Sequence, residues 1–161
     1  VESHGAMGAA EAVFTDVQAN GNGGDGIASW ADAYGAGGDA LTTFLRTETP
    51  NNRGCGIYTE VYSEQGDAYL TGERVVSFSN RQDGVQIYTY AGSDVFADFG
   101  NGAQGSAGLC SIYSNTVFNM NNTGSDPVTA QSNWWGSATP PAGKFSGSID
   151  RSNPLAADPN L

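Results

Sequence analysis

Three aspartates recur at matching points of the sequence and are the first candidates for chemistry. Asp39, Asp67 and Asp94 follow one another at nearly equal intervals, and each directly precedes a short β-prone run. If these runs stack, the like charges would approach to about 5 Å and repel, which a bridging calcium ion would relieve. Alternatively, each aspartate accepts hydrogen bonds from the backbone of a turn, and we favour this interpretation. Calcium is thus a candidate ligand, but no cofactor is required.

A polysaccharide lyase or glycoside hydrolase would need several acidic residues and a basic residue on one exposed face. Besides the three aspartates, the candidate acids are Glu60, Glu64 and Glu73, and the candidate basic residues are Arg74 and Arg81. We assign no catalytic residue from this set, and the sequence favours a protein that is not an enzyme.

Three tyrosines each follow an isoleucine in a similar local sequence, namely Tyr58, Tyr88 and Tyr113. Because neighbouring side chains of a strand point to opposite faces, burying the isoleucines would expose the tyrosines. They then predict an exposed aromatic stripe that stacks on sugar rings or contacts a neighbouring subunit. The alternative is that tyrosine simply suits β-strands.

Several other sites are excluded by residue type. The only histidine is His4, so one chain can form neither a histidine-containing triad nor a histidine-rich zinc site. Two cysteines without neighbouring histidines make no structural zinc site. The glycine-rich run at 21–26 lacks the Lys-Ser/Thr pair of a phosphate-binding loop.

The composition of the 161-residue chain predicts an acidic all-β protein. It has 23 Gly, and its 6 Lys plus Arg face 17 Asp plus Glu, for a net charge of −11. This charge argues against nucleic acid and anionic lipid as partners, and no run approaches the ~20 apolar residues of a membrane span. Because the chain starts at Val1, we expect a processed product, secreted or at the cell surface.

An internal repeat indicates the secondary structure that holds these residues. Four similar segments contain Ile27, Ile57, Ile87 and Ile112, which recur at similar intervals along the chain. A period of about 28 residues suits one coil of a parallel β-helix with three short strands. An α-solenoid would need amphipathic helical runs, and a propeller blade would need about 40 residues.

This repeat also predicts which side chains are buried. With the four isoleucines inside, the residues two positions further on also point inward, as a small polar ladder of Ser29, Thr59, Thr89 and Ser114.

The two cysteines are expected to stay unpaired. Cys55 and Cys110 would lie two coils apart, or about 9.6 Å at the usual strand spacing, beyond the ~7 Å that a disulfide spans. They are therefore predicted to be free and buried. Asn121 begins an Asn-Asn-Thr glycosylation sequon, which has meaning only in a eukaryotic secretory host.

The last part of the chain departs from the repeat. It contains Asn133-Trp134-Trp135-Gly136, then two consecutive prolines at 140–141, and finally Asn153-Pro154-Leu155. The open end of a β-helix exposes both a sheet edge and a core cross-section. We therefore predict that Trp134 and Trp135 cover this end, and that proline, including Pro154, blocks the addition of further strands.

These residues and the repeat resemble the C-terminal end of pectate-lyase-like right-handed β-helix proteins, in which an Asn-aromatic-Trp-Gly turn and a Ser-Pro-x-Leu strand close the last coils. Here Ser152-Asn153-Pro154-Leu155 has one residue inserted before the proline. The resemblance covers about residues 11–161 and implies the right-handed fold. It does not assign a function, because this superfamily includes lyases, hydrolases, epimerases and adhesins.

The sequence thus predicts an all-β, right-handed parallel β-helix of about four coils plus a closing segment. Residues 1–10 form an N-terminal segment that pairs with an upstream domain or another copy, 11–132 the coils, and 133–161 the closing segment. Head-to-tail stacking would give a filament. The expected function is an extracellular structural or assembly module. The alternatives are a fragment of a polysaccharide lyase or hydrolase and a carbohydrate-binding module.

Overall fold

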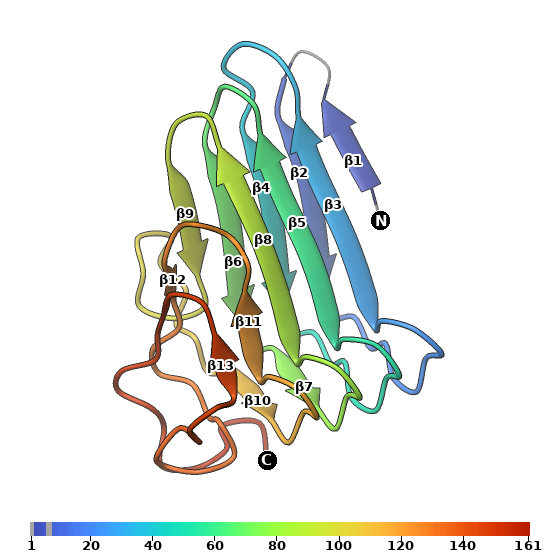
Figure 1. Ribbon diagram of the computed structural model, residues 1–161, viewed down its shortest axis with the longest axis vertical. Helices are drawn as coiled ribbons and strands as arrows, with labels where there is room; N and C mark the ends of the chain where they lie inside the picture. Colours follow the sequence, from blue (N-terminus) through green and yellow to red (C-terminus); the bar gives the residue numbers. More distant parts are fainter. Residues whose placement is uncertain (1, 6–7) are drawn as a thin grey trace.

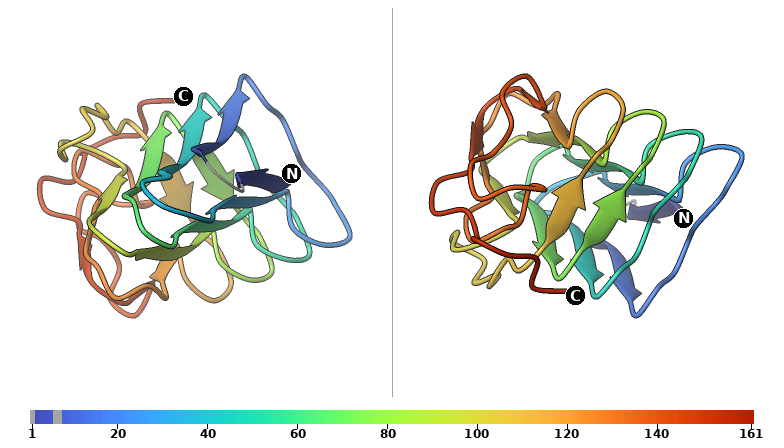
Figure 2. Two further views of the ribbon diagram at one scale, coloured as in Figure 1. Left: turned by 90° about the horizontal axis from the view of Figure 1, so that it is seen from above. Right: turned by 90° about the horizontal axis from the view of Figure 1, so that it is seen from below.

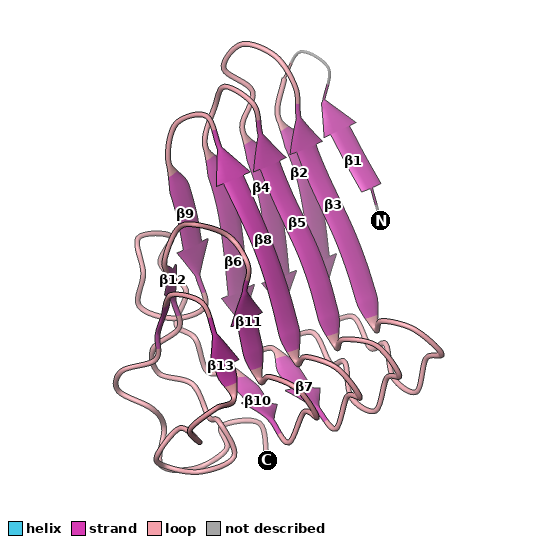
Figure 3. Ribbon diagram, in the orientation of Figure 1, coloured by secondary structure: helices cyan, strands magenta, loops and turns pink. Residues whose placement is uncertain are grey.

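The computed structural model describes residues 2–5 and 8–161, and the side chain of His4 lies outside that description. Within this part, every regular element is a strand and the strands pair in parallel (Figures 1 and 3). They stack as a β-solenoid of about five turns, with the first turn and the last segment at opposite ends (Figure 2). The predicted parallel β-helix is confirmed. The additional turn lies ahead of Ile27, at the N-terminal end.

Two six-stranded sheets form the long faces of the solenoid, and a short third sheet closes one side. The first sheet, in spatial order, contains β1 (Glu2–Gly5), β3 (Ile27–Ala33), β5 (Ile57–Ser63), β8 (Val85–Ala91), β11 (Met120–Asn122) and β13 (Phe145–Ser146). The second contains β2 (Ala10–Thr15), β4 (Ala40–Leu45), β6 (Ala68–Glu73), β9 (Val95–Asp98), β12 (Val128–Thr129) and β14 (Ile149–Asp150). The third pairs β7 (Val76–Phe78) with β10 (Ser111–Tyr113).

The register of the coils differs from the predicted isoleucine alignment after the second repeat. Ile57 pairs with Ile27 as expected, but on its other side it pairs with Val85, so that Ile87 lies opposite Thr59. Ile112 belongs to the third sheet, and the neighbouring strand of the first sheet is instead β11, whose Met120 lies beside Val85. A shift by two residues keeps the same side chains inside, so the alternation of the sequence could not reveal it.

The glycine that precedes each of these strands is a better marker of register than the isoleucine. Gly26, Gly56 and Gly84 lie directly before β3, β5 and β8. A Cβ atom on Gly84 would lie 2.5 Å from Asn115 Nδ2 and from the Asn119 carbonyl oxygen. Because the next coil approaches so closely, only glycine fits at this corner, and it fixes where the strand begins.

The predicted inward polar ladder is formed only in part. Ser29 and Thr59 lie opposite each other and are fully buried, as expected. Thr89 is displaced by the changed register and lies opposite Val61, and Ser114 lies outside the strands with a φ of 54°. Thr89 is buried as predicted, but its place in the ladder is wrong, and the prediction is wrong altogether for the exposed Ser114.

Aromatic rings fill the interior beside the second sheet. Phe14 and Phe44 occupy the same position of adjacent coils and stack with their ring centroids 5.1 Å apart. The next position is Gly72, where a Cβ atom would collide with the ring of Phe99. Phe99 thus fills the volume that glycine leaves, and this alternation of large and small residues keeps the core closely packed.

A buried column of asparagines ties the turns together at the corner between the third and the first sheet. Asn52 accepts hydrogen bonds at Oδ1 from the backbone and side-chain nitrogens of Asn22, both at 2.9 Å. Asn80 receives the same pair of bonds from Asn52 at 2.8 and 3.1 Å, and Asn115 receives them from Asn80 at 3.1 and 2.9 Å. Each amide therefore satisfies the backbone N–H group of the preceding turn.

Both cysteines are free and buried, as predicted, although the predicted geometry was wrong. Cys55 precedes β5 of the first sheet, whereas Cys110 precedes β10 of the third sheet. They therefore lie on different corners of the solenoid. Burial raises the pKa of the Cys55 thiol to about 11 and that of Cys110 to about 12, so both stay protonated at neutral pH.

Candidate functional site

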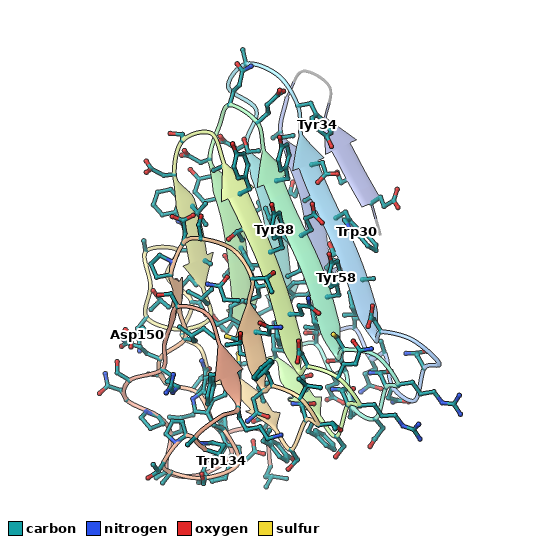
Figure 4. The ribbon with its side chains drawn as sticks, in the orientation of Figure 1. Trp30, Tyr34, Tyr58, Tyr88, Trp134 and Asp150 are labelled. Carbon is teal, nitrogen blue, oxygen red and sulfur yellow. The ribbon has the colours of Figure 1, made fainter. Side chains whose placement is uncertain are left out.

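An aromatic surface covers the outer face of the first sheet. Because the isoleucines and valines of β3, β5 and β8 point inward, the alternate residues point outward. Together with Tyr34, just after β3, they contribute the aromatic face, which consists of Trp30, Tyr34, Tyr58, Tyr62, Tyr88 and Tyr90. Figure 4 shows four of these side chains over the strands of this sheet. The exposed fractions of Tyr34, Tyr88 and Tyr90 are 45%, 37% and 45%, so these rings are available to a ligand.

The parallel register arranges these residues in rows that cross the strands. One row contains Trp30, Glu60 and Tyr88, and the next contains Asp32, Tyr62 and Tyr90. Adjacent members of a row are separated by one strand spacing of about 4.8 Å. A chain-like ligand that lies across the strands would therefore meet an aromatic ring, a carboxylate and a second aromatic ring in succession.

The rings support one another by contacts between coils. The Tyr62 ring stacks on Tyr90 with centroids 5.1 Å apart and an interplanar angle of 13°, and its other neighbour is Tyr34 at 5.7 Å. Trp30 and Tyr58 are tilted against each other at 5.6 Å. Such contacts restrict ring motion before a ligand arrives, which lowers the entropic cost of binding.

The charge of this face is negative. Glu60 lies between Trp30 and Tyr88 in one row of the aromatic face. Tyr58 Oη donates a long hydrogen bond of 3.5 Å to Glu60 Oε2. Burial, followed by the charge of Asp32, raises the pKa of Glu60 above its ordinary value. Asp32 is itself buried, and its charge is the main cause of the raised pKa of Tyr34.

The three tyrosines predicted to form one stripe do not lie together. Tyr58 and Tyr88 share the aromatic face, but in different rows, since Tyr58 lies opposite Gln86. Tyr113 belongs to the third sheet, where its ring stacks on Phe78 with centroids 5.2 Å apart. The prediction of one stripe is therefore wrong, because it relied on the isoleucine alignment that placed Ile112 in the first sheet.

Sequence reasoning missed most of the aromatic face. Trp30, Tyr62 and Tyr90 were not singled out, although alternation from the buried isoleucine at the start of each strand reaches them directly. Tyr34 follows the end of β3, and no period of the sequence marks it. Extending the alternation to the full length of each strand would have found three of the four.

The three repeated aspartates do stack at one corner, directly before β4, β6 and β9. Asp39 Oδ1 accepts a hydrogen bond from the backbone nitrogen of Asp67 at 3.0 Å, and Asp67 Oδ1 accepts one from that of Asp94 at 3.1 Å. Tyr69 Oη also donates to Asp67 Oδ2 at 2.8 Å, and these donors lower the pKa of Asp67. The turn interpretation expected bonds within one turn, whereas these backbone donors belong to the neighbouring coil. In the described part of the chain, no three His, Cys, Asp or Glu side chains gather to hold a metal.

The candidate catalytic residues are spread over the molecule. Glu60 points outward from the first sheet and Glu64 follows the end of β5. Glu73 ends β6 and accepts a hydrogen bond from the backbone nitrogen of Ala107 at 3.2 Å, and Arg74 comes next in the sequence. Arg81 lies in the turn after the third sheet. Because these residues lie on different faces, they do not form the compact acid–base set that a lyase or hydrolase requires.

The sequon asparagine is part of the fold. Asn121 lies in β11 and donates a hydrogen bond from Nδ2 to Asp83 Oδ2 at 2.9 Å, and its Oδ1 atom is buried.

The closing segment continues two sheets before it covers the end of the solenoid. Its strands β13 and β14 pair in parallel with β11 and β12. Trp135 is fully buried and packs edge-on against Phe145 with ring centroids 4.9 Å apart. Trp134 is half-buried and forms a bridge to Ser111, extending the third sheet, while Pro154 is half-buried close to the C-terminus. Figure 4 shows Trp134 at the end of the solenoid, with Asp150 of β14 on its flank.

The structure provides no helix in its described part that is long and apolar enough to cross a bilayer. Comparison with models of known protein families, with curated proteins and with solved structures found no match to this chain.

Proposed function

We propose that this protein is a carbohydrate-binding module that holds a polysaccharide chain on its aromatic face. The observation that carries this proposal is the concentration of five aromatic side chains on three adjacent strands, with Tyr34 directly after β3 and the Glu60 carboxylate between two of the rings. Sugar rings expose apolar C–H faces that stack on aromatic rings, and their hydroxyl groups donate hydrogen bonds to carboxylates. Contiguous exposed apolar patches of this kind generally mark binding sites.

The spacing of the face supports an extended ligand. Trp30 and Tyr88 are two strands apart in one row, which places their Cα atoms about 9.6 Å apart. This separation suits two sugar units of one chain, with Glu60 at the link between them. The binding function requires no catalytic residue, in agreement with the scattered positions of the acids and bases.

The test is binding of a set of soluble oligosaccharides by isothermal titration calorimetry. We expect Trp30→Ala and Tyr88→Ala each to weaken binding by about tenfold or more, as the loss of one stacking ring implies. Tyr113→Ala is the matched control, because this tyrosine stacks on Phe78 away from the face. Equal losses in all three variants, or no binding by the unmodified protein, would contradict the proposal.

A second candidate function, assembly into larger structures, is favoured by the edges of the sheets. Within the described residues, β1 and β2 are the terminal strands of their sheets, and the edge of a sheet is a place where another strand can pair. A second copy, or a preceding part of a longer chain, could add strands there. Mass photometry and negative-stain electron microscopy, with and without calcium, test this function. Ordered assemblies support it, and a uniform monomer under both conditions refutes self-assembly.

We further propose membership of the pectate-lyase-like superfamily and a location outside the cell. The three parallel sheets, the asparagine column and the buried Trp135 of the closing segment support the first proposal. The acidic composition with a single lysine supports the second. An experimental structure with left-handed coils would refute the first, and a natural precursor without an export signal would refute the second.

A further inference from the structure

The aromatic face has an unusual electrostatic character. Strands β3, β5 and β8 contain no lysine, arginine or histidine, whereas they contribute two carboxylates, Asp32 and Glu60. Glu64 follows directly after β5, and its charge adds to the effect of burial, which is the main cause of the raised pKa of Tyr62. Every ionisable side chain that these strands present at neutral pH is therefore negative, on a protein whose net charge is already −11.

This charge decides between classes of polysaccharide. An acidic glycan such as a polyuronate would bring its carboxylates against Glu60, and β3, β5 and β8 contain no lysine or arginine to offset this repulsion. A neutral glycan would stack on the rings but would leave the half-buried Glu60 carboxylate with weaker partners. A glycan with ammonium groups would provide both the counter-charge and the stacking.

The geometry of the aromatic face also favours a glycan with ammonium groups. Glu60 is flanked by Trp30 and Tyr88 in the same row, and its hydrogen bond from Tyr58 is long at 3.5 Å. An ammonium group that pairs with this carboxylate would also lie close to aromatic faces, where cation–π attraction adds to the ion pair. Repeated ammonium groups would place further charges near Tyr62 and Tyr90 of the next row.

We propose that the ligand is an amino-sugar polysaccharide with free ammonium groups, and that Glu60 is the side chain that selects it. This inference rests on the proposed binding function of the same face. It names the ligand class and the selecting residue, which that function leaves open. A basic peptide carries similar charge, but its flexible side chains lack the rigid rings that would use an extended aromatic platform.

The test compares four ligands by titration calorimetry in a mildly acidic buffer in which amino sugars are charged. They are a glucosamine hexasaccharide, its fully N-acetylated form, a galacturonate hexasaccharide and hexalysine. We expect the glucosamine oligomer to bind about tenfold more tightly than the N-acetylated form, and the galacturonate oligomer not to bind. Added salt should weaken only the attraction between the Glu60 carboxylate and the ammonium groups of the ligand.

The variant Glu60→Gln should abolish the preference for the glucosamine oligomer over the N-acetylated form. Glu48→Gln is the control, because it removes the same charge from an exposed residue bridged to β7 of the third sheet. Circular dichroism would verify that both variants fold.

Each outcome has a distinct meaning. Equal binding of the glucosamine and N-acetylated forms, with Glu60→Gln silent, would overturn the charge selection but leave carbohydrate binding in place. Preference for the galacturonate oligomer would overturn it as well. Hexalysine binding as tightly as the glucosamine oligomer would overturn the amino-sugar assignment in favour of a basic polypeptide. Failure of all three oligosaccharides would refute the proposed function itself.

Discussion

Some residues of this protein serve its fold and others serve binding, and Glu60 is the clearest example of the second kind. Its carboxylate lies on a half-buried face next to Asp32, where burial and the neighbouring charge raise its pKa. An ionised carboxyl in such a place makes the folded state less stable. Among the side chains that the structure describes, no cation forms an ion pair with Glu60, and a carboxylate that costs stability in this way is a candidate for function.

The raised pKa of Glu60 predicts how stability depends on pH. The folded state binds the Glu60 proton more tightly than the unfolded state, so this residue's contribution falls as pH rises from its unfolded pKa through its folded pKa. We therefore expect Glu60→Gln to raise the melting temperature at pH 7, with a smaller gain at pH 4. Thermal denaturation at the two pH values measures this. A loss of stability at pH 7 would show that the ionised carboxylate is well accommodated.

Lys144, the only lysine, has a structural role. Its Nζ atom donates hydrogen bonds to the backbone carbonyls of Asn115, Thr116 and Val117 at 2.7, 2.9 and 3.3 Å. Replacement by Met would remove these donors and lower the free energy of unfolding by about 1–3 kcal/mol. Chemical denaturation measures the change. Arg53→Met, which removes an exposed cation from another loop, serves as control and should change stability by less than about 0.5 kcal/mol.

At the scale of elements, the coils are aligned by their corners more than by their strands. Alternation along the strands correctly predicted which side chains are buried, because inward and outward positions do not depend on a shift of two residues. It could not predict which residues lie opposite each other. Gly84 and Asn80 provide that information, through the close approach of the next coil and the hydrogen bonds between turns.

The asparagine column therefore makes a strong prediction about stability. Asn52 is fully buried and its amide exchanges hydrogen bonds with Asn22, Asn80 and the Ala19 carbonyl. We expect Asn52→Ala to lower the free energy of unfolding by about 2–4 kcal/mol, because the backbone nitrogen of Asn22 loses its acceptor and a small cavity is created.

The control for this change is Asn20→Ala, in an exposed position of the corresponding turn. It should change the free energy of unfolding by less than about 0.5 kcal/mol. Urea denaturation of both variants would provide the comparison. Equal effects of the two substitutions would mean that the column does not hold the coils in register.

At the scale of the whole molecule, the sequence predicted the class of fold but not the composition of the candidate site. The repeat of similar segments and the outward–inward alternation were sufficient for a parallel solenoid, since few other folds combine them. Tyr113 was assigned to the wrong sheet because the local sequence around Ile112 resembles a first-sheet strand. The segment that occupies the first sheet there, Met120–Asn122, has no residue pattern in common with β3, β5 or β8.

The aromatic face emerges only when three coils are stacked. Trp30, Tyr62 and Tyr90 lie in three different repeats of the sequence, and their proximity depends on the register. Local properties of the sequence cannot supply this register, because it is determined by contacts between turns. The same stacking brings Glu60 between Trp30 and Tyr88, which creates the charge pattern that we propose selects the ligand.

The most direct test of the central claim is an NMR titration of the ¹⁵N-labelled protein with the glucosamine hexasaccharide. We expect progressive shifts of the Trp30 indole N–H signal and of backbone amides in β3, β5 and β8, with little change in the second and third sheets. Shifts concentrated on the second or third sheet, or no shift at millimolar ligand, would contradict the assignment of the aromatic face as the binding site.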